Sequence, residues 1–169
     1  MKIFLLFLSF LFFPILSFAA ECDFISADKR PMYEQDMNNA LNKILYDKIT
    51  YNKKTLKEML IDFNNQAYYI SKKPLSIKIK NQDKYIKQLD TMFGTISLFP
   101  DTICEELQPV INKYNLGIVP GSECDKYLCS NFIKGCNIEN YSEFEKLIKL
   151  KEIVSENINT TRSNLIKEK

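Results

Sequence analysis

The sequence predicts an all-α protein: an irregular bundle of about five helices, stabilised by disulfides, behind an N-terminal signal peptide. Three observations carry this prediction. Apolar residues recur at helical spacings along most of the 169 residues, five cysteines are present, and the first twenty residues are almost entirely apolar. Because no repeat, Gly/Ser-rich linker or low-complexity block divides the remainder, residues 21–169 are expected to form a single domain.

Residues 1–20 have the order of an export signal. Lys2 precedes an apolar run from position 3 to 18, and small residues at Ser17 and Ala19 favour cleavage after Ala19 or Ala20. The alternative is an uncleaved anchor, since residues 3–20 just reach the roughly 18 residues that can span a bilayer. We therefore expect an extracytoplasmic protein, periplasmic or secreted, that contacts the membrane at this segment only if the signal stays uncleaved.

Two amphipathic helices are predicted after the signal. The first begins near Pro31, which suits a first helical turn, and the second follows Asn52, a residue type that caps helices. Their apolar stripes have helical spacing. The first stripe consists of Tyr33, Met37, Leu41, Ile44 and Leu45, and the second of Leu56, Met59, Leu60, Phe63, Ala67 and Ile70.

The next segment changes its pattern at Pro74. Leu75, Ile77 and Ile79 alternate with polar residues, which is typical of extended chain. Because a lone strand has no partner here, we expect an extended connector. A third helix is then predicted from Gln82 to Phe93, with Gly94 placed to end it.

A fourth helix is predicted to begin at Asp101. Pro109 lies inside its apolar pattern and should kink it or split it into two short helices. Further on, Ser122 with Asp125 resembles a capping box for a short helix that reaches toward Gly135.

The last helix is predicted over about residues 141–168. Its apolar stripe consists of Phe144, Leu147, Ile148, Val154, Ile158 and Leu165. The stripe is dense up to Val154 and sparse after Ile158. We therefore expect the final turns to project beyond the core or to fray.

The five cysteines, Cys22, Cys104, Cys124, Cys129 and Cys136, predict a disulfide framework with one cysteine unpaired. A pairing of Cys104 with the later cluster is favoured, and Cys129 with Cys136 is an option across the turn at Gly135. A bridge from Cys22 to Cys104 would close a longer loop and constrain the unfolded chain more. The alternative is a four-cysteine zinc site made of Cys104, Cys124, Cys129 and Cys136, but the usual short ligand spacing is missing.

Histidine is absent, which removes histidine-based nucleophilic catalysis and every metal site that needs imidazole. Glu58 and Asp62 are four residues apart on the second helix and could form the acid and base of a small secreted hydrolase, such as a glycosidase. A solvated charged face shared with Lys54 explains the same spacing. We assign no catalytic residue, metal ligand or cofactor.

One local charge imbalance stands out in a chain whose net charge is only +2. It comprises Lys72, Lys73, Lys78, Lys80, Lys84 and Lys87 against Asp83 alone, with tyrosines nearby. Such a segment could bind an anionic surface or an acidic protein, although a solvated charged face is the more common explanation.

The leading expectation for the whole protein is an exported, non-enzymatic helical protein that binds another protein, as an envelope or secretion-apparatus component or as an inhibitor or immunity-type protein. Nucleic acid is not an expected partner.

Overall fold

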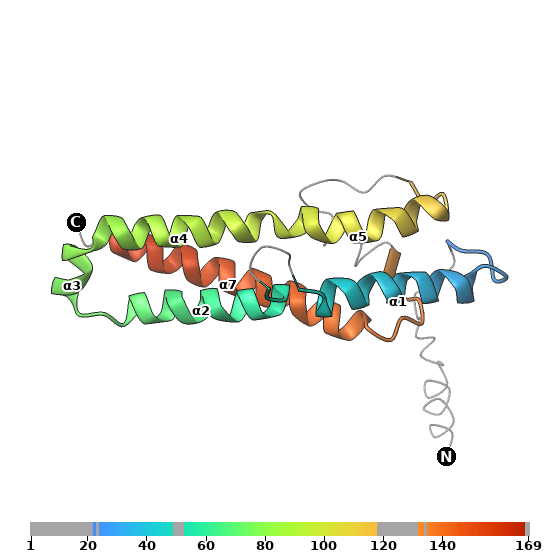
Figure 1. The fold of residues 1–169 in the computed structure, drawn as a ribbon, viewed down its shortest axis with the longest axis horizontal. Coiled ribbons are helices and arrows are strands. Elements are labelled where there is room, and N and C mark those ends of the chain that lie inside the picture. The colour runs from blue at the N-terminus through green and yellow to red at the C-terminus, as the bar shows by residue number, and fades with distance from the viewer. Residues whose placement is uncertain (1–21, 23, 49–52, 118–131, 134, 168–169) are drawn as a thin grey trace, which may run out of the picture.

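A computed structural model describes residues 22, 24–48, 53–117, 132–133 and 135–167, which are helices and short connections without a β-strand (Figure 1). The all-α prediction is therefore confirmed for this part of the chain. The signal segment 1–20 and most of the short helix predicted from Ser122 lie outside it. Among the described helices, none combines the length and the apolar character needed to cross a bilayer.

The helices form an elongated bundle (Figure 1). Helix α1 (Arg30–Tyr46) and helix α2 (Leu56–Ser71) follow one another along one side, and the short helix α3 (Leu75–Lys80) turns the chain at the far end. Helices α4 (Gln82–Ser97) and α5 (Phe99–Lys113) return along the other side. Helix α7 (Tyr141–Lys167) packs against α2, α4 and α1, and α1 also packs against α5.

One continuous apolar core runs along the bundle. It contains every residue of the stripes predicted for α1, α2 and α7 except Phe63, which is partly buried against it, so these stripes are confirmed with that one exception. The largest fully buried side chains are Tyr33, Met37, Leu41, Leu60, Leu89, Ile103, Leu107, Ile111, Ile133, Phe144 and Ile158.

Helix α2 begins later than expected. Its N-cap is Thr55 rather than Asn52. The Thr55 hydroxyl accepts from the Glu58 backbone N–H at 3.2 Å, and the Glu58 carboxylate accepts from the Thr55 N–H at 2.8 Å. This reciprocal capping box satisfies two backbone donors that a helix start leaves unpaired.

The connector prediction for residues 75–79 is wrong, because this segment is helix α3. Its backbone groups pair locally: the Ile77 and Lys78 N–H groups each donate to the Pro74 carbonyl at 3.0 Å. An isolated extended segment would leave such groups without protein partners, whereas one helical turn satisfies them internally. The alternation of apolar residues therefore does not indicate a strand here.

Helix α4 does not end at Gly94 but continues to Ser97. Glycine costs about 1 kcal/mol in a helix interior relative to alanine. Ile96, which is 3 % exposed, packs into the core beyond it. That burial outweighs the local preference of the glycine.

Helix α5 begins at Phe99 rather than Asp101 and is not split by Pro109. Leu107 and Ile111, on either side of this proline, are both fully buried. Their packing holds the two halves in one helix despite the donor that proline lacks.

The final turns of α7 stay packed, in contrast to the projection or fraying expected from the sequence. Ile158 and Thr161 are buried, and Leu165 is 2 % exposed. The Gln82 side chain donates to the Leu165 carbonyl at 2.5 Å, which joins the end of α7 to the start of α4. The sparse stripe suffices because α2 and α4 lie on either side of it.

Candidate functional site

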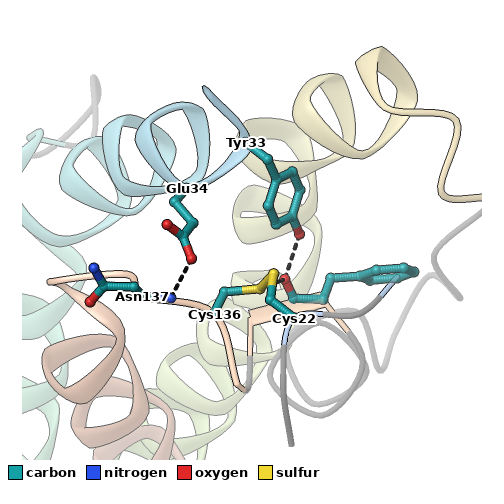
Figure 2. Close-up of a disulfide and its surroundings, with 6 residues drawn as sticks. Cys22, Tyr33, Glu34, Cys136 and Asn137 are labelled. Atoms are coloured by element: carbon teal, nitrogen blue, oxygen red, sulfur yellow. Dashed lines mark hydrogen bonds between the residues drawn. A yellow bond between two sulfur atoms is a disulfide. The ribbon is translucent and has the colours of Figure 1, made fainter. Parts of the chain in front are cut away.

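A disulfide joins Cys22 to Cys136, with their Cα atoms 4.6 Å apart (Figure 2). The bond connects the segment before α1 to the segment before α7 across 114 residues of sequence. Closing a loop of this length removes about 5 kcal/mol of conformational entropy from the unfolded chain in the loop-closure model. Cys22 is 2 % exposed, so the bond is part of the core.

The cysteine predictions divide into three outcomes. The Cys129 to Cys136 option is wrong, because Cys136 is bonded to Cys22. Cys104 is also disulfide-bonded, with a partner outside the described residues, where Cys124 and Cys129 lie. The zinc alternative is wrong as well, since Cys104 and Cys136 are oxidised and a zinc ligand must be a thiolate.

Side chains from the first turns of α1 form hydrogen bonds with the segment around this disulfide (Figure 2). The Tyr33 hydroxyl donates to the Phe132 carbonyl, and the Glu34 carboxylate accepts from the Asn137 N–H at 2.6 Å. One turn further along, the Asn38 side-chain oxygen accepts from the Asn140 N–H at 3.1 Å. These bonds pair the backbone of the segment before α7, so this region has a structural role.

Asp36 lies on the same helix and joins α1 to α5. Its carboxylate accepts from the Lys113 ammonium at 2.6 Å and from the Tyr114 hydroxyl at 2.7 Å. The Lys113 hydrogen bond holds the pKa of Asp36 below its ordinary value. Burial and the hydrogen bond to Asp36 raise the pKa of Tyr114 to about 12.

We expect Asp36→Asn to lower the free energy of unfolding by about 1 kcal/mol at neutral pH. Because the folded pKa of Asp36 is lowered, its stabilisation is present above the ordinary aspartate pKa of 3.8 and is lost as the pH falls through the folded value. The difference from the wild type should therefore shrink in acid. Urea unfolding at neutral pH and near pH 3 measures it, with Glu105→Gln on α5 as the exposed control. A difference that is equally large at both pH values would contradict the assignment.

The candidate carboxylates Glu58 and Asp62 already have partners. Glu58 is part of the capping box, and its hydrogen bond from the Thr55 N–H lowers its pKa. Asp62 forms an exposed ion pair with Lys54. A general acid needs a raised pKa, so the environment of Glu58 does not favour that role.

The six lysines of the charge imbalance gather around α3. Lys72 and Lys73 follow α2, Lys78 and Lys80 belong to α3, and Lys84 and Lys87 lie in the first turns of α4. We call these six lysines, together with Leu75 and Ile79, the basic end. Figure 1 shows α3 at the extremity of the bundle.

Sequence reasoning found the lysines but missed the exposed aliphatic residues between them. Helix α3 contains no buried residue, and Leu75 and Ile79 are 55 % and 53 % exposed. The signal in the sequence is the Pro74 boundary followed by aliphatic residues that alternate with polar ones, a pattern that predicts a connector rather than an exposed helix.

A hollow of about 290 Å³ lies beside α3. It is lined by Ser71, Lys78, Thr161, Asn164, Leu165 and Lys167, from the ends of α2 and α7 and from α3. The lining has two lysines and no acidic residue among these side chains. It therefore adds positive charge to the basic end.

Comparison of the chain with protein-family models, curated proteins and solved structures gave no match. The residues on the surface of this helical protein are therefore the basis for its proposed function.

Proposed function

We propose that this chain is an exported, non-enzymatic binding protein that acts through its basic end. The observation that carries the proposal is α3, which exposes aliphatic residues at the tip of a packed bundle and has the other lysines of the basic end before and after it in the chain. The free energy falls when a partner covers aliphatic residues that are otherwise exposed to water. The lysines indicate that this partner is negatively charged.

The rest of the molecule suits the role of a rigid support. The core runs to Leu165, next to the start of α4, and the Cys22 to Cys136 disulfide constrains the other half. A stable disulfide is the rule in extracytoplasmic compartments, which agrees with the export signal predicted over residues 1–20. A surface held by a rigid bundle loses less conformational entropy when it binds, which favours binding.

Site-specific photocrosslinking tests the proposal. A benzophenone amino acid replaces Ser76 on α3, and a matched chain carries it at Lys149 on α7, where the side chain is also exposed. Both chains are expressed in full in their native host. We expect an adduct from position 76 and little from position 149, with mass spectrometry identifying what is attached. Equal labelling at the two positions, or none at position 76, would contradict a binding role for the basic end.

A further inference from the structure

We propose that the basic end docks on a bilayer surface that contains anionic lipid. This inference rests on the proposed function, because it names the partner that the same surface binds. Four features of the surface support a bilayer as the partner: the face of α3, the charge around it, the nearby tyrosines and its small size.

Helix α3 presents a small aliphatic face. Successive residues in a helix are rotated by about 100°, so Leu75 and Ile79 lie within about 40° of each other on one face. Ile77 lies nearly opposite and is the least exposed of the three, at 41 %. Leu75 and Ile79 therefore form the outward aliphatic face of the tip.

Lysines border this face on both sides. By the same rotation, Lys78 lies about 60° to one side of Leu75, and Lys80 lies about 100° to the other side of Ile79. Lys72, three residues before α3, and Lys84, in the first turn of α4, are also exposed. A lysine near an anionic bilayer strengthens binding about fivefold, so several together give a large effect.

The last turn of α2 adds amphipathic side chains. Tyr68 and Tyr69 are both exposed, and the Lys73 ammonium lies 3.6 Å from the centroid of the Tyr69 ring. Lys72 lies 5.3 Å from the centroid of the Tyr68 ring. Tyrosine and lysine combine an apolar body with a polar tip, a combination that is favourable at the boundary between headgroups and acyl chains.

The size and shape of the surface favour a bilayer over a protein. A stable protein interface uses about 20 residues on each side, whereas the basic end and the two tyrosines are ten residues, of which only two are aliphatic. Membrane-surface binding needs only a shallow apolar insertion supported by charge attraction. Helix α3 lies at the extremity of the bundle, which is the position from which a flat surface is most easily approached (Figure 1).

Vesicle sedimentation of the exported, disulfide-bonded protein is the test. We expect binding to vesicles of phosphatidylcholine mixed with phosphatidylglycerol, and binding at least about tenfold weaker to phosphatidylcholine alone. High salt should weaken the binding, because it screens exposed lysines. Equal binding to both vesicles, or none to the anionic ones, would overturn the proposal.

Two variants and two controls locate the surface. Leu75→Ser with Ile79→Ser, and Lys72→Gln with Lys80→Gln and Lys84→Gln, should each lower the partition coefficient at least about tenfold. The controls change exposed residues on the sides of the bundle: Ile61→Ser with Ile153→Ser, and Lys57→Gln with Lys146→Gln and Lys149→Gln. All replaced side chains are exposed, so the helical content by circular dichroism should stay unchanged. Equal losses in variants and controls would overturn the assignment to the basic end.

The two proposals fail in distinguishable ways. A lipid adduct from the crosslinker at position 76 supports both. A defined protein adduct at that position, with no vesicle binding, leaves the binding function standing and overturns the lipid partner. No adduct at position 76 and no vesicle binding overturns both.

Discussion

Replacing Cys22 and Cys136 together with alanine is expected to lower the free energy of unfolding by about 2–5 kcal/mol. The bond closes 114 residues, and its removal releases the unfolded chain from this constraint. Alanine is the better replacement because Cys22 is buried and a serine hydroxyl would need a partner there. Guanidinium unfolding monitored by circular dichroism measures the change.

The double replacement leaves no free thiol at this junction and retains Cys104 with its own disulfide. Mass mapping under non-reducing conditions should show that second bond unchanged in the variant. A strong reductant should destabilise the wild type at least as much as the double replacement does. An unfolding midpoint equal to that of the wild type would show that the Cys22 to Cys136 bond does not stabilise the fold.

Leu165→Ala near the end of α7 is expected to lower the free energy of unfolding by about 2–5 kcal/mol, the usual range for a buried leucine. Leu165 is 2 % exposed, and truncation would leave a cavity beside α4. Its neighbour Ile166 is 45 % exposed and provides a matched control. Ile166→Ala should change the stability by less than about 0.5 kcal/mol. Chemical unfolding of both variants measures the contrast.

This pair of variants decides between the two descriptions of the last helix. If its final turns frayed, as the sparse apolar stripe suggested, Leu165→Ala and Ile166→Ala would have equally small effects. Amide exchange of the backbone around Leu165 gives an independent measurement. Exchange as slow as in the middle of α7 is expected from the packed end.

Helical periodicity predicted the elements whose apolar faces meet the core. The stripes of α1, α2 and α7 follow from spacing alone, and their members are buried except Phe63, which is partly buried. Burial of such a stripe contributes more than any single cap or breaker, so the pattern decides the element. The first helix begins at Arg30, and Pro31 lies in its first turn, where the fixed φ angle of proline suits a helix.

Local signals failed where packing opposed them. Gly94 and Pro109 are poor helix residues in isolation, yet α4 and α5 run through them because buried residues lie on both sides. The alternating pattern of α3 failed for a different reason. No neighbouring strand exists among the described residues to accept its backbone hydrogen bonds, and a short helix satisfies them locally.

The sequence by itself determined the helical class, most of the core-facing residues of α1, α2 and α7, the excess of lysines between Lys72 and Lys87, and the lack of histidine chemistry. These follow from composition and from spacing along the chain. Only the tertiary structure decided that Cys22 pairs with Cys136 and that Leu75 and Ile79 are exposed on a helix at one tip of the bundle. The reason is physical: both depend on which distant segments come together, and that is set by how the apolar faces of α1, α2, α4, α5 and α7 pack.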